Sequence, residues 1–255
     1  MNSNSICILQ SYDEKRMTPW LEGCRCSVQA WANSQGYDYL FIENELFDEV
    51  PDWYMHKVAD KLPVASDLGR LQWILKLHQQ YEAVVWLDID VLVFEPEHLS
   101  VDFQGRDCIF GQELWLQIND SHLKTYRNVH NAYMGFRQGS STLPFLIDTV
   151  TRLVKDVDEA YIAPQFVGPK LLGSLHNTVG FALEGRVGAL SDVWVEKYLS
   201  HDEASLEMYQ QQLKVPMYAA NLCLSLHADD GGEMETLVES LLTMGFGKTE
   251  SEMDR

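Results

Sequence analysis

The run VVWLDIDVLVFEP (84–96) constrains the fold of this chain more than any other stretch. It is apolar whichever face each side chain takes, which is typical of a strand buried on both sides within a parallel sheet. The same run contains two carboxylates, Asp88 and Asp90. Because an unpaired charge is costly to bury, these two aspartates need a hydrogen-bonding partner or a metal ion there.

Strand and helix patterns alternate through the first hundred residues. Short apolar segments bounded by glycine or polar residues predict strands, and apolar residues at helical spacing predict helices. The expected elements are a strand over 6–10, a helix over 19–34, a strand over 37–42, a short helix near 53–60, a helix from Ser66 to about Gln80 and a strand over 83–94. This alternation favours a parallel α/β sheet.

The second half of the chain is less regular. We expect strands at 108–112, 132–137, 215–219 and 222–227, a helix at 142–156, a loop leading into a helix over 165–176, and a weak helix at 235–244. The predicted fold class is a single α/β domain with a mostly parallel central sheet flanked by helices. We assign residues 1–228 to this domain, in two halves (1–96 and 97–228), and residues 229–255 to an acidic C-terminal helix and tail.

The charge of the chain excludes one class of function. With a formal net charge of −19, the protein lacks the basic surface that nucleic-acid binding requires, and it repels anionic membranes. A phosphate-bearing substrate would therefore need a local cation, which carboxylates can hold.

The cysteines and the lengths of the apolar runs bear on the cellular compartment in which the protein works. Five cysteines at scattered positions form neither a disulfide framework nor a zinc spacing. The first residues lack the basic and apolar regions of a signal peptide, and no apolar run approaches the roughly 20 residues that span a bilayer. We expect a cytoplasmic protein with reduced thiols and no transmembrane segment.

The paired aspartates are the leading candidates for chemistry. On a strand, Asp88 and Asp90 would share one face, and ligands gather at the C-terminal ends of parallel strands. Two carboxylates there suit Mg²⁺ or Mn²⁺. The alternative is that one aspartate caps a turn and the other pairs with an arginine.

The segment SDLGRLQWILKLHQQYEAVVWLDID (66–90) resembles the D-x-D sugar transferases with a GT-A-type fold, especially the retaining group with the pattern S-D-x-x-R before the D-x-D strand. The resemblance implies transfer of a sugar from a nucleotide-sugar donor, with residues 1–96 as the nucleotide-sugar half and residues 97–228 as the acceptor half. It places a metal on Asp88 and Asp90, and Asp67 and Arg70 along the donor site. Asp67 and Arg70 are three apart on a helix, so a surface ion pair is the alternative.

Three later fragments extend the resemblance. VHNAYMGFRQGSSTLPFLIDTV (129–150) is similar to the acceptor-side stretch and contains Asn131. FVGPKLL (166–172), with Gly168 and Lys170, is similar to the family's "GP" loop. SLHADDG (225–231) is similar to its late metal-binding segment, with His227 as a third ligand.

The sequence also departs from the family. Gln79 and Gln80 stand where Gly-Gly is common, and the aromatic residue that usually follows the late histidine is missing. His227 would otherwise make a local hydrogen bond, and Asp229 or Asp230 would replace it as a ligand.

The resemblance gives each candidate a role. Asp90 would bind the metal directly, and Asp88 would contact the ribose or a metal-bound water. Arg70, Lys57 and Lys170 would stabilise the departing diphosphate; Asp88, Asp90 and Arg70 form the catalytic set. Two further candidates are Tyr12, which would stack on the donor base or belong to the core, and Asn131, which would bind a sugar hydroxyl or cap a turn. Lys57 would otherwise be a solvated helix residue.

Two other functions remain open. LDIDVLVF also fits the first motif of the haloacid-dehalogenase phosphatases, in which Asp88 would be the nucleophile and Asp90 the acid–base. Against this, a strand–helix–strand unit precedes the motif and Val91 follows it. The other possibility is a non-catalytic protein that binds a nucleotide sugar. No carboxylate stands out as a base for the acceptor, which favours retention of the anomeric configuration.

Overall fold

Two sheets organise the chain. The structure is a computed structural model that describes residues 5–227 and 231–246. The larger sheet has six strands in the order β2-β1-β3-β6-β5-β7, and the smaller has three in the order β4-β9-β8. The strands are β1 (Ile6–Ser11), β2 (Asp38–Ile42), β3 (Ala83–Leu87), β4 (Val91–Val93), β5 (Cys108–Asn119), β6 (His122–Arg137), β7 (Ala182–Glu184), β8 (Val187–Ala189) and β9 (Ala219–Asn221).

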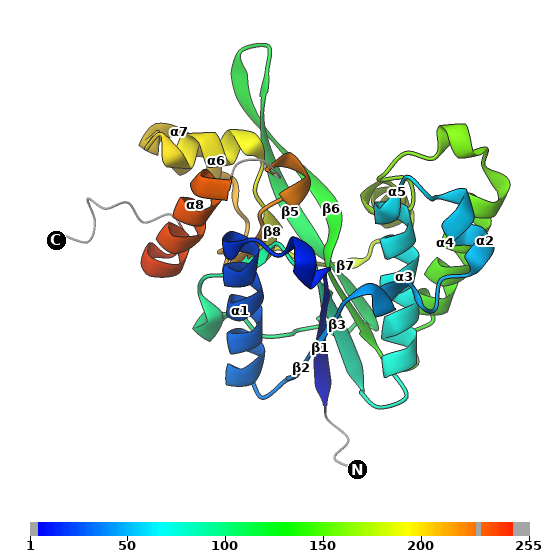
Figure 1. Cartoon of the computed structure of the whole chain (residues 1–255). Helices are drawn as coiled ribbons and strands as arrows, with labels where there is room; N and C mark the ends of the chain where they lie inside the picture. Colours follow the sequence, from blue (N-terminus) through cyan, green and yellow to red (C-terminus); the bar gives the residue numbers. More distant parts are fainter. Residues whose placement is uncertain (1–4, 228–230, 247–255) are drawn as a thin grey trace.

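Helices cover both faces of the larger sheet (Figure 1). The α-helices are α1 (Pro19–Ser34), α2 (Asp52–Lys57), α3 (Leu62–Leu77), α4 (Thr142–Asp156), α5 (Pro169–Val179), α6 (Asp192–Leu199), α7 (Glu203–Gln212) and α8 (Gly231–Met244). Single 3₁₀ turns are η1 (Glu14–Arg16), η2 (Asn44–Phe47), η3 (Pro96–His98), η4 (Glu159–Tyr161) and η5 (Leu224–Leu226). Strand pairs β1–β2, β1–β3 and β5–β7 are parallel, and β6 is antiparallel to both β3 and β5. The predicted fold class, an α/β domain with a mostly parallel central sheet, is confirmed.

Strand β3 is apolar on both faces because both faces are covered. Val84 and Trp86 pack into the core beneath α3 and α4. Val85 and Leu87 pack into a second core beside α1. This two-sided burial explains the continuous apolar run in the sequence. A side chain at position 88 therefore follows Trp86 toward α3.

Helix α3 begins earlier than predicted. Ser66 does not cap it; the helix starts at Leu62 with Pro63 in its first turn, where the missing proline N–H costs nothing. Asp67 and Arg70 consequently lie within the helix and are buried against the sheet, rather than at a solvated helix start.

The long hairpin of β5 and β6 projects beyond the sheet (Figure 1). Its strands were predicted only as 108–112 and 132–137. Asp120 and Ser121 form the turn with φ values of 50° and 63°, as a two-residue hairpin turn of type I′ requires. The outer part was missed because polar residues interrupt the apolar pattern on one face.

The late segments differ most from prediction. The strands expected at 215–219 and 222–227 are wrong: β9 spans Ala219–Asn221, and Leu224–Leu226 is the 3₁₀ turn η5. Helices α6 and α7 and strands β7 and β8 were not predicted.

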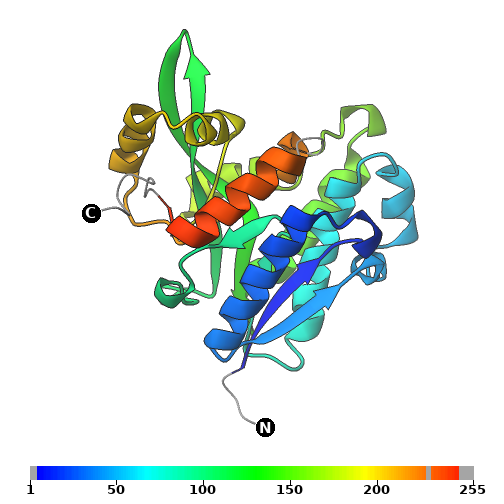
Figure 2. The same cartoon turned by 60° about the vertical axis from the view of Figure 1, so that its left-hand side comes forward.

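Helix α8, expected at 235–244, begins at Gly231 and lies against α1 (Figure 2). Met234 and Leu237 share a core with Leu21 and Cys24. The proposed division of the chain at residues 96 and 228 stays a prediction, and the tail lies outside the described residues from 247 onward. No helix in the described residues is long and apolar enough to cross a bilayer.

Candidate functional site

The D-x-D motif is a turn that joins the two sheets. Strand β3 ends at Leu87, and β4 begins at Val91 and pairs with β9. The Val91 N–H donates to the Asp88 carbonyl at 3.1 Å, which closes the turn. The expectation of one strand over 83–94 with both aspartates on one strand face is therefore wrong. Both side chains nevertheless line the same cleft.

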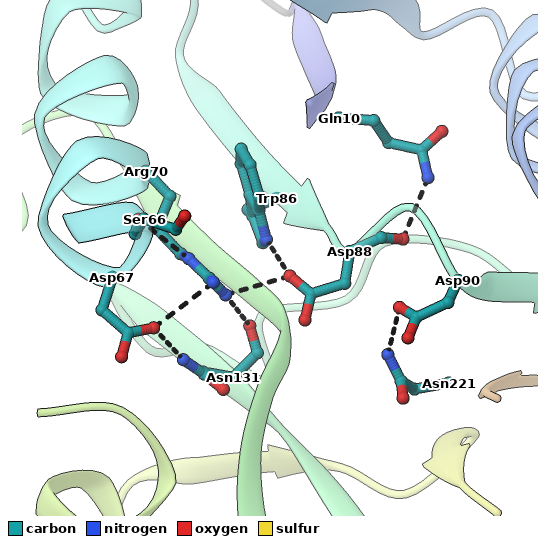
Figure 3. Close-up of polar contacts among 9 residues, drawn as sticks. All are labelled: Gln10, Ser66, Asp67, Arg70, Trp86, Asp88, Asp90, Asn131 and Asn221. Atoms are coloured by element: carbon teal, nitrogen blue, oxygen red, sulfur yellow. Dashed lines mark hydrogen bonds and ion pairs between the residues drawn. The ribbon is translucent and has the colours of Figure 1, made fainter. Parts of the chain in front are cut away.

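Hydrogen bonds from distant elements fix the backbone of this turn. The Asp88 N–H donates to the carbonyl of Ala132 on β6 at 2.9 Å. Gln10, at the end of β1, donates from Nε2 to the Asp88 carbonyl at 3.0 Å (Figure 3). The Gln10 side chain is fully buried. The turn is thus held by both strands that flank β3 in the sheet.

The Asp88 carboxylate is paired on one oxygen and partly open to the cleft. Its Oδ1 accepts from Arg70 Nη1 at 3.0 Å and from Trp86 Nε1 at 2.6 Å (Figure 3). The guanidinium of Arg70 also lies over the Trp86 ring, 5.0 Å from its centroid. The Asp88 side chain is 28 % exposed. Asp88 therefore has a fixed orientation and an oxygen available to a ligand.

Arg70 links Asp88 to a second, buried carboxylate. Its Nη2 lies 3.3 Å from Asp67 Oδ1, and Nη1 also donates to the Asn131 carbonyl at 3.1 Å. Asn131 Nδ2 donates to Asp67 Oδ1 at 2.7 Å. Burial raises the pKa of Asp67 to about 6, even with Arg70 beside it. The surface ion pair considered as the alternative is excluded, because these side chains are 9 % and 7 % exposed.

Asp90 has a different environment. Its Oδ1 accepts from Asn221 Nδ2 at 2.6 Å, and its Oδ2 accepts from the Leu224 N–H at 2.7 Å. Both donors are neutral and belong to β9 or the segment after it. Burial, and then the negative charge of Asp88, raise the pKa of Asp90 to about 6. Among the described residues, Asp90 thus has no cationic partner of the kind that Asp88 has.

The cleft has a volume of about 1650 Å³ and two walls. Helices α3 and α5 provide one wall, which includes Arg70 and Lys170. The β5–β6 hairpin provides the other, which includes Trp115. Tyr12 follows β1 and lines the same cleft half-buried, with the Arg16 guanidinium 5.7 Å from its ring centroid.

Gly168 lies where α5 begins, directly against Asp67. A Cβ atom at this position would be 2.7 Å from Asp67 Oδ2 and 3.0 Å from Asn131 Nδ2. Only a glycine allows this approach. Gly168 therefore lets α5 pack against the Asp67–Asn131 pair, and the exposed Lys170, two residues later, lines the cleft.

Two predicted residues are not brought to the site. Lys57 is absent from the cleft lining and donates from Nζ to the Lys155 carbonyl at 2.7 Å, because the carbonyls at the end of α4 attract a cation. His227 is buried outside the cleft lining, since η5 replaces the strand that was to carry it to Asp90. Among the described residues, no three acidic, histidine or cysteine side chains converge on one point. Asp229 and Asp230 lie outside the described residues.

Sequence reasoning missed the hydrogen-bonding partners of the motif. Gln10 and Asn221 are 78 and 131 residues from the aspartates they contact, so no local pattern indicates them. The indole of Trp86 is different, because it lies two residues before Asp88 and shares its strand face. A β-bulge was also missed: the pairing of β5 with β6 shifts register between Phe110 and Gly111. The shift leaves the carbonyls of Asn131 and Ala132 to accept hydrogen bonds from Arg70 and from the Asp88 N–H.

No protein-family model matches the sequence. The chain is similar to a glycosyltransferase involved in the glycosylation of the major capsid of PBCV-1, at 12 % identity and a TM-score of 0.46, covering 91 % of this chain and 99 % of that one. It is also similar to mouse xyloside xylosyltransferase 1 in its apo form, at 8 % identity and a TM-score of 0.46, covering 87 % and 98 %. At this distance the activity has to be argued from the residues of this chain.

Proposed function

We propose that this protein is a glycosyltransferase that depends on a divalent cation and moves a sugar from a nucleoside-diphosphate sugar to a hydroxyl acceptor such as a saccharide. One observation carries the proposal. Two carboxylates from the turn that joins the two sheets line one cleft, and burial together with the charge of Asp88 raises the pKa of Asp90. A cation between them would relieve this repulsion.

The donor set fits Mg²⁺ or Mn²⁺. Magnesium is commonly held by one or two carboxylates, with waters and substrate phosphates as its other ligands, so a third protein ligand is not required. The hydrogen bonds given to the Asp88 carboxylate by described residues go to Oδ1, which leaves Oδ2 for the ion. When bound, the cation neutralises charge that develops on the leaving diphosphate.

The other side chains act by holding and orienting. Arg70 fixes Asp88 through Oδ1 and balances the charge of Asp67. Lys170 offers a positive charge to the donor phosphates, and Tyr12 offers a ring to the nucleotide base. Asn131 uses its amide nitrogen on Asp67, so it positions this network instead of binding a sugar hydroxyl through that group.

Two finer parts belong to the same proposal. All five cysteines lie in the described residues and are free thiols, which supports a reducing location such as the cytoplasm. Retention of configuration remains our expectation. Glu113 lies in the cleft and is the carboxylate that an inverting reaction would use as a base. The anomer of the product, read by NMR, decides between the two outcomes.

A panel of nucleoside-diphosphate sugars tests the function. We expect one or more to raise the melting temperature only with Mn²⁺ or Mg²⁺, through binding to the native state, and to transfer sugar to a hydroxyl acceptor. Binding without any turnover would support a non-catalytic protein. Hydrolysis of p-nitrophenyl phosphate through a phosphoaspartate at Asp88 would support the phosphatase. Either result would contradict the proposal.

A further inference from the structure

The projecting hairpin has one face that packs and one that faces the cleft. On β5, Leu114 and Leu116 are buried in the core that also contains residues of α6 and α7. Side chains alternate along a strand, so Glu113, Trp115 and Gln117 point to the opposite side. These three residues line the cleft, as the alternation requires.

Strand β6 extends the same surface. Tyr126 lies directly opposite Trp115, and Asn128 lies opposite Glu113. Paired residues of antiparallel strands share a face. Asn128 Nδ2 donates to Glu113 Oε1 at 2.8 Å, and Tyr126 is 39 % exposed. We call the surface formed by Glu113, Trp115, Gln117, Tyr126 and Asn128 the arm face.

We propose that the arm face binds the acceptor of the sugar-transfer reaction, and that this acceptor is a saccharide whose ring lies on Trp115 and Tyr126. The inference rests on the proposed function. It names the acceptor class and the residues that would select it, which neither the paired aspartates nor the donor chemistry specifies.

The chemistry of the arm face matches a sugar. Two neighbouring aromatic rings offer flat apolar area to the C–H faces of a pyranose, as aromatic side chains do for partly apolar ligands. The amide and carboxylate groups of Gln117, Asn128 and Glu113 offer donors and acceptors to hydroxyl groups. A purely apolar partner would leave these groups desolvated without hydrogen bonds.

The position of the arm face also matches an acceptor. Four of its five residues, all except Tyr126, line the wall of the cleft opposite Arg70 and Lys170, and the aspartates lie in the same cleft. A saccharide bound there lies in the space that the donor sugar enters, while the phosphates remain on the side of the cations. The Glu113 carboxylate on the arm face disfavours an anionic group at that face.

Trp115→Ala tests the proposal. The probes are p-nitrophenyl glycosides of xylose, glucose, galactose and mannose, with affinities measured by saturation-transfer NMR in the absence of donor. We expect at least one glycoside to bind and Trp115→Ala to weaken it about tenfold, the size expected for losing one aromatic contact. Tyr126→Ala should weaken the same glycoside, and Trp115→Phe should retain part of the binding. Circular dichroism checks that each variant is folded.

Trp53→Ala is the matched control. Trp53 is a tryptophan of α2, is 41 % exposed and lies outside the cleft lining. We expect unchanged glycoside binding in this variant. The proposal is overturned if no glycoside binds, if the two arm variants bind as the wild type does, or if Trp115→Ala changes the oligomeric state, which would assign the arm face to a second copy. Binding of Mn²⁺ with a nucleoside diphosphate, measured on the same samples, should be unchanged in Trp115→Ala; its absence from the wild type would instead contradict the proposed function.

Discussion

The two aspartates of the motif are one residue apart, yet they belong to opposite electrostatic environments. Asp88 faces the larger sheet, where a guanidinium and an indole N–H hold it. Asp90 faces the smaller sheet, where the Asn221 amide and the Leu224 N–H donate to it. The turn between β3 and β4 produces this separation, because it directs Asp90 away from α3 toward β9.

This difference shows how a protein can orient two carboxylates for a cation before the cation binds. On the Asp88 side, the single guanidinium of Arg70 is shared between two carboxylates, those of Asp88 and Asp67. On the Asp90 side, the donors that the described residues provide are neutral. Three carboxylates thus lie near one guanidinium, and burial and then the charge of Asp88 raise the pKa of Asp90. Variants on the two sides should therefore fail in different ways.

The largest effect is expected at Arg70. Arg70→Met leaves the buried Asp67 carboxylate without its counter-charge, and breaking a buried pair from one side costs about 3–5 kcal/mol. Urea unfolding measures this loss. The double variant Arg70→Met with Asp67→Asn should recover part of it, because the uncompensated charge is gone. A loss below about 1 kcal/mol in the single variant would contradict the buried ion pair.

The next largest effect is expected in the cation-dependent stabilisation of variants at Asp88 and Asp90, compared with a variant elsewhere in the cleft. With Mn²⁺ and a nucleoside diphosphate at a hundred times the dissociation constant, the wild type should gain about 2.7 kcal/mol of stability. Asp88→Asn and Asp90→Asn should lose this gain. Asp60→Asn is the control, since Asp60 is an exposed acid in the lining of the same cleft. Equal gains in stability in all four proteins would show that the two aspartates do not bind the cation.

Two glycines, Gly168 at the N-cap of α5 and Gly173 within α5, test the contact that supports the Asp88 side. Gly168→Ala should destabilise by about 1–3 kcal/mol, because its Cβ would lie 2.7 Å from Asp67 Oδ2. Gly173→Ala should be neutral or stabilising by about 0.5–1 kcal/mol, because no atom of the described residues lies within 4 Å of its Cβ position and alanine favours a helix. Thermal unfolding compares them, and the reverse order would show that α5 is not seated on Asp67.

The smallest effect concerns pH. Because a cation must displace the proton from Asp90, Mn²⁺ affinity should fall about tenfold for each pH unit below 6. Without a cation the trend in stability has the opposite sign. The folded pKa of Asp90 is raised from 3.8 to about 6, so its contribution favours the folded state below pH 4 and is lost as pH rises through 6. Calorimetry at pH 5, 6 and 7 measures the affinity, and a constant affinity would contradict the raised pKa.

Local patterns were enough to predict the core of the larger sheet. The apolar run at 84–87 predicted β3, and the helical spacing of 19–34 predicted α1. Gly36 follows the C-cap of α1 with a φ of 71°, a backbone conformation typical of the glycine that ends a helix. Asp67, Arg70 and Asp88, which the resemblance places in one site, lie together in the structure, because α3 carries the first two and Asp88 directly follows β3. Periodicity is sufficient where each element buries a continuous apolar face.

The remainder depends on contacts that no local pattern records. The turn at Asp88–Asp90 was predicted to be strand because apolar strands, β3 and β4, lie directly before and after it in the sequence. Asn221 reaches Asp90 only because β9 pairs with β4, and that pairing joins residues far apart in the sequence. His227 was misplaced for the same reason, since the segment before it is a 3₁₀ turn instead of a strand.

The most direct test of the account is a crystal of the protein grown with Mn²⁺ and a nucleoside diphosphate, with data collected at the manganese absorption edge. The account predicts an anomalous peak within coordinating distance, about 2.0–2.3 Å, of carboxylate oxygens of both Asp88 and Asp90, with the diphosphate on the same ion. A nucleotide bound elsewhere, or a diphosphate held in the cleft with no ion between the two aspartates, would contradict it.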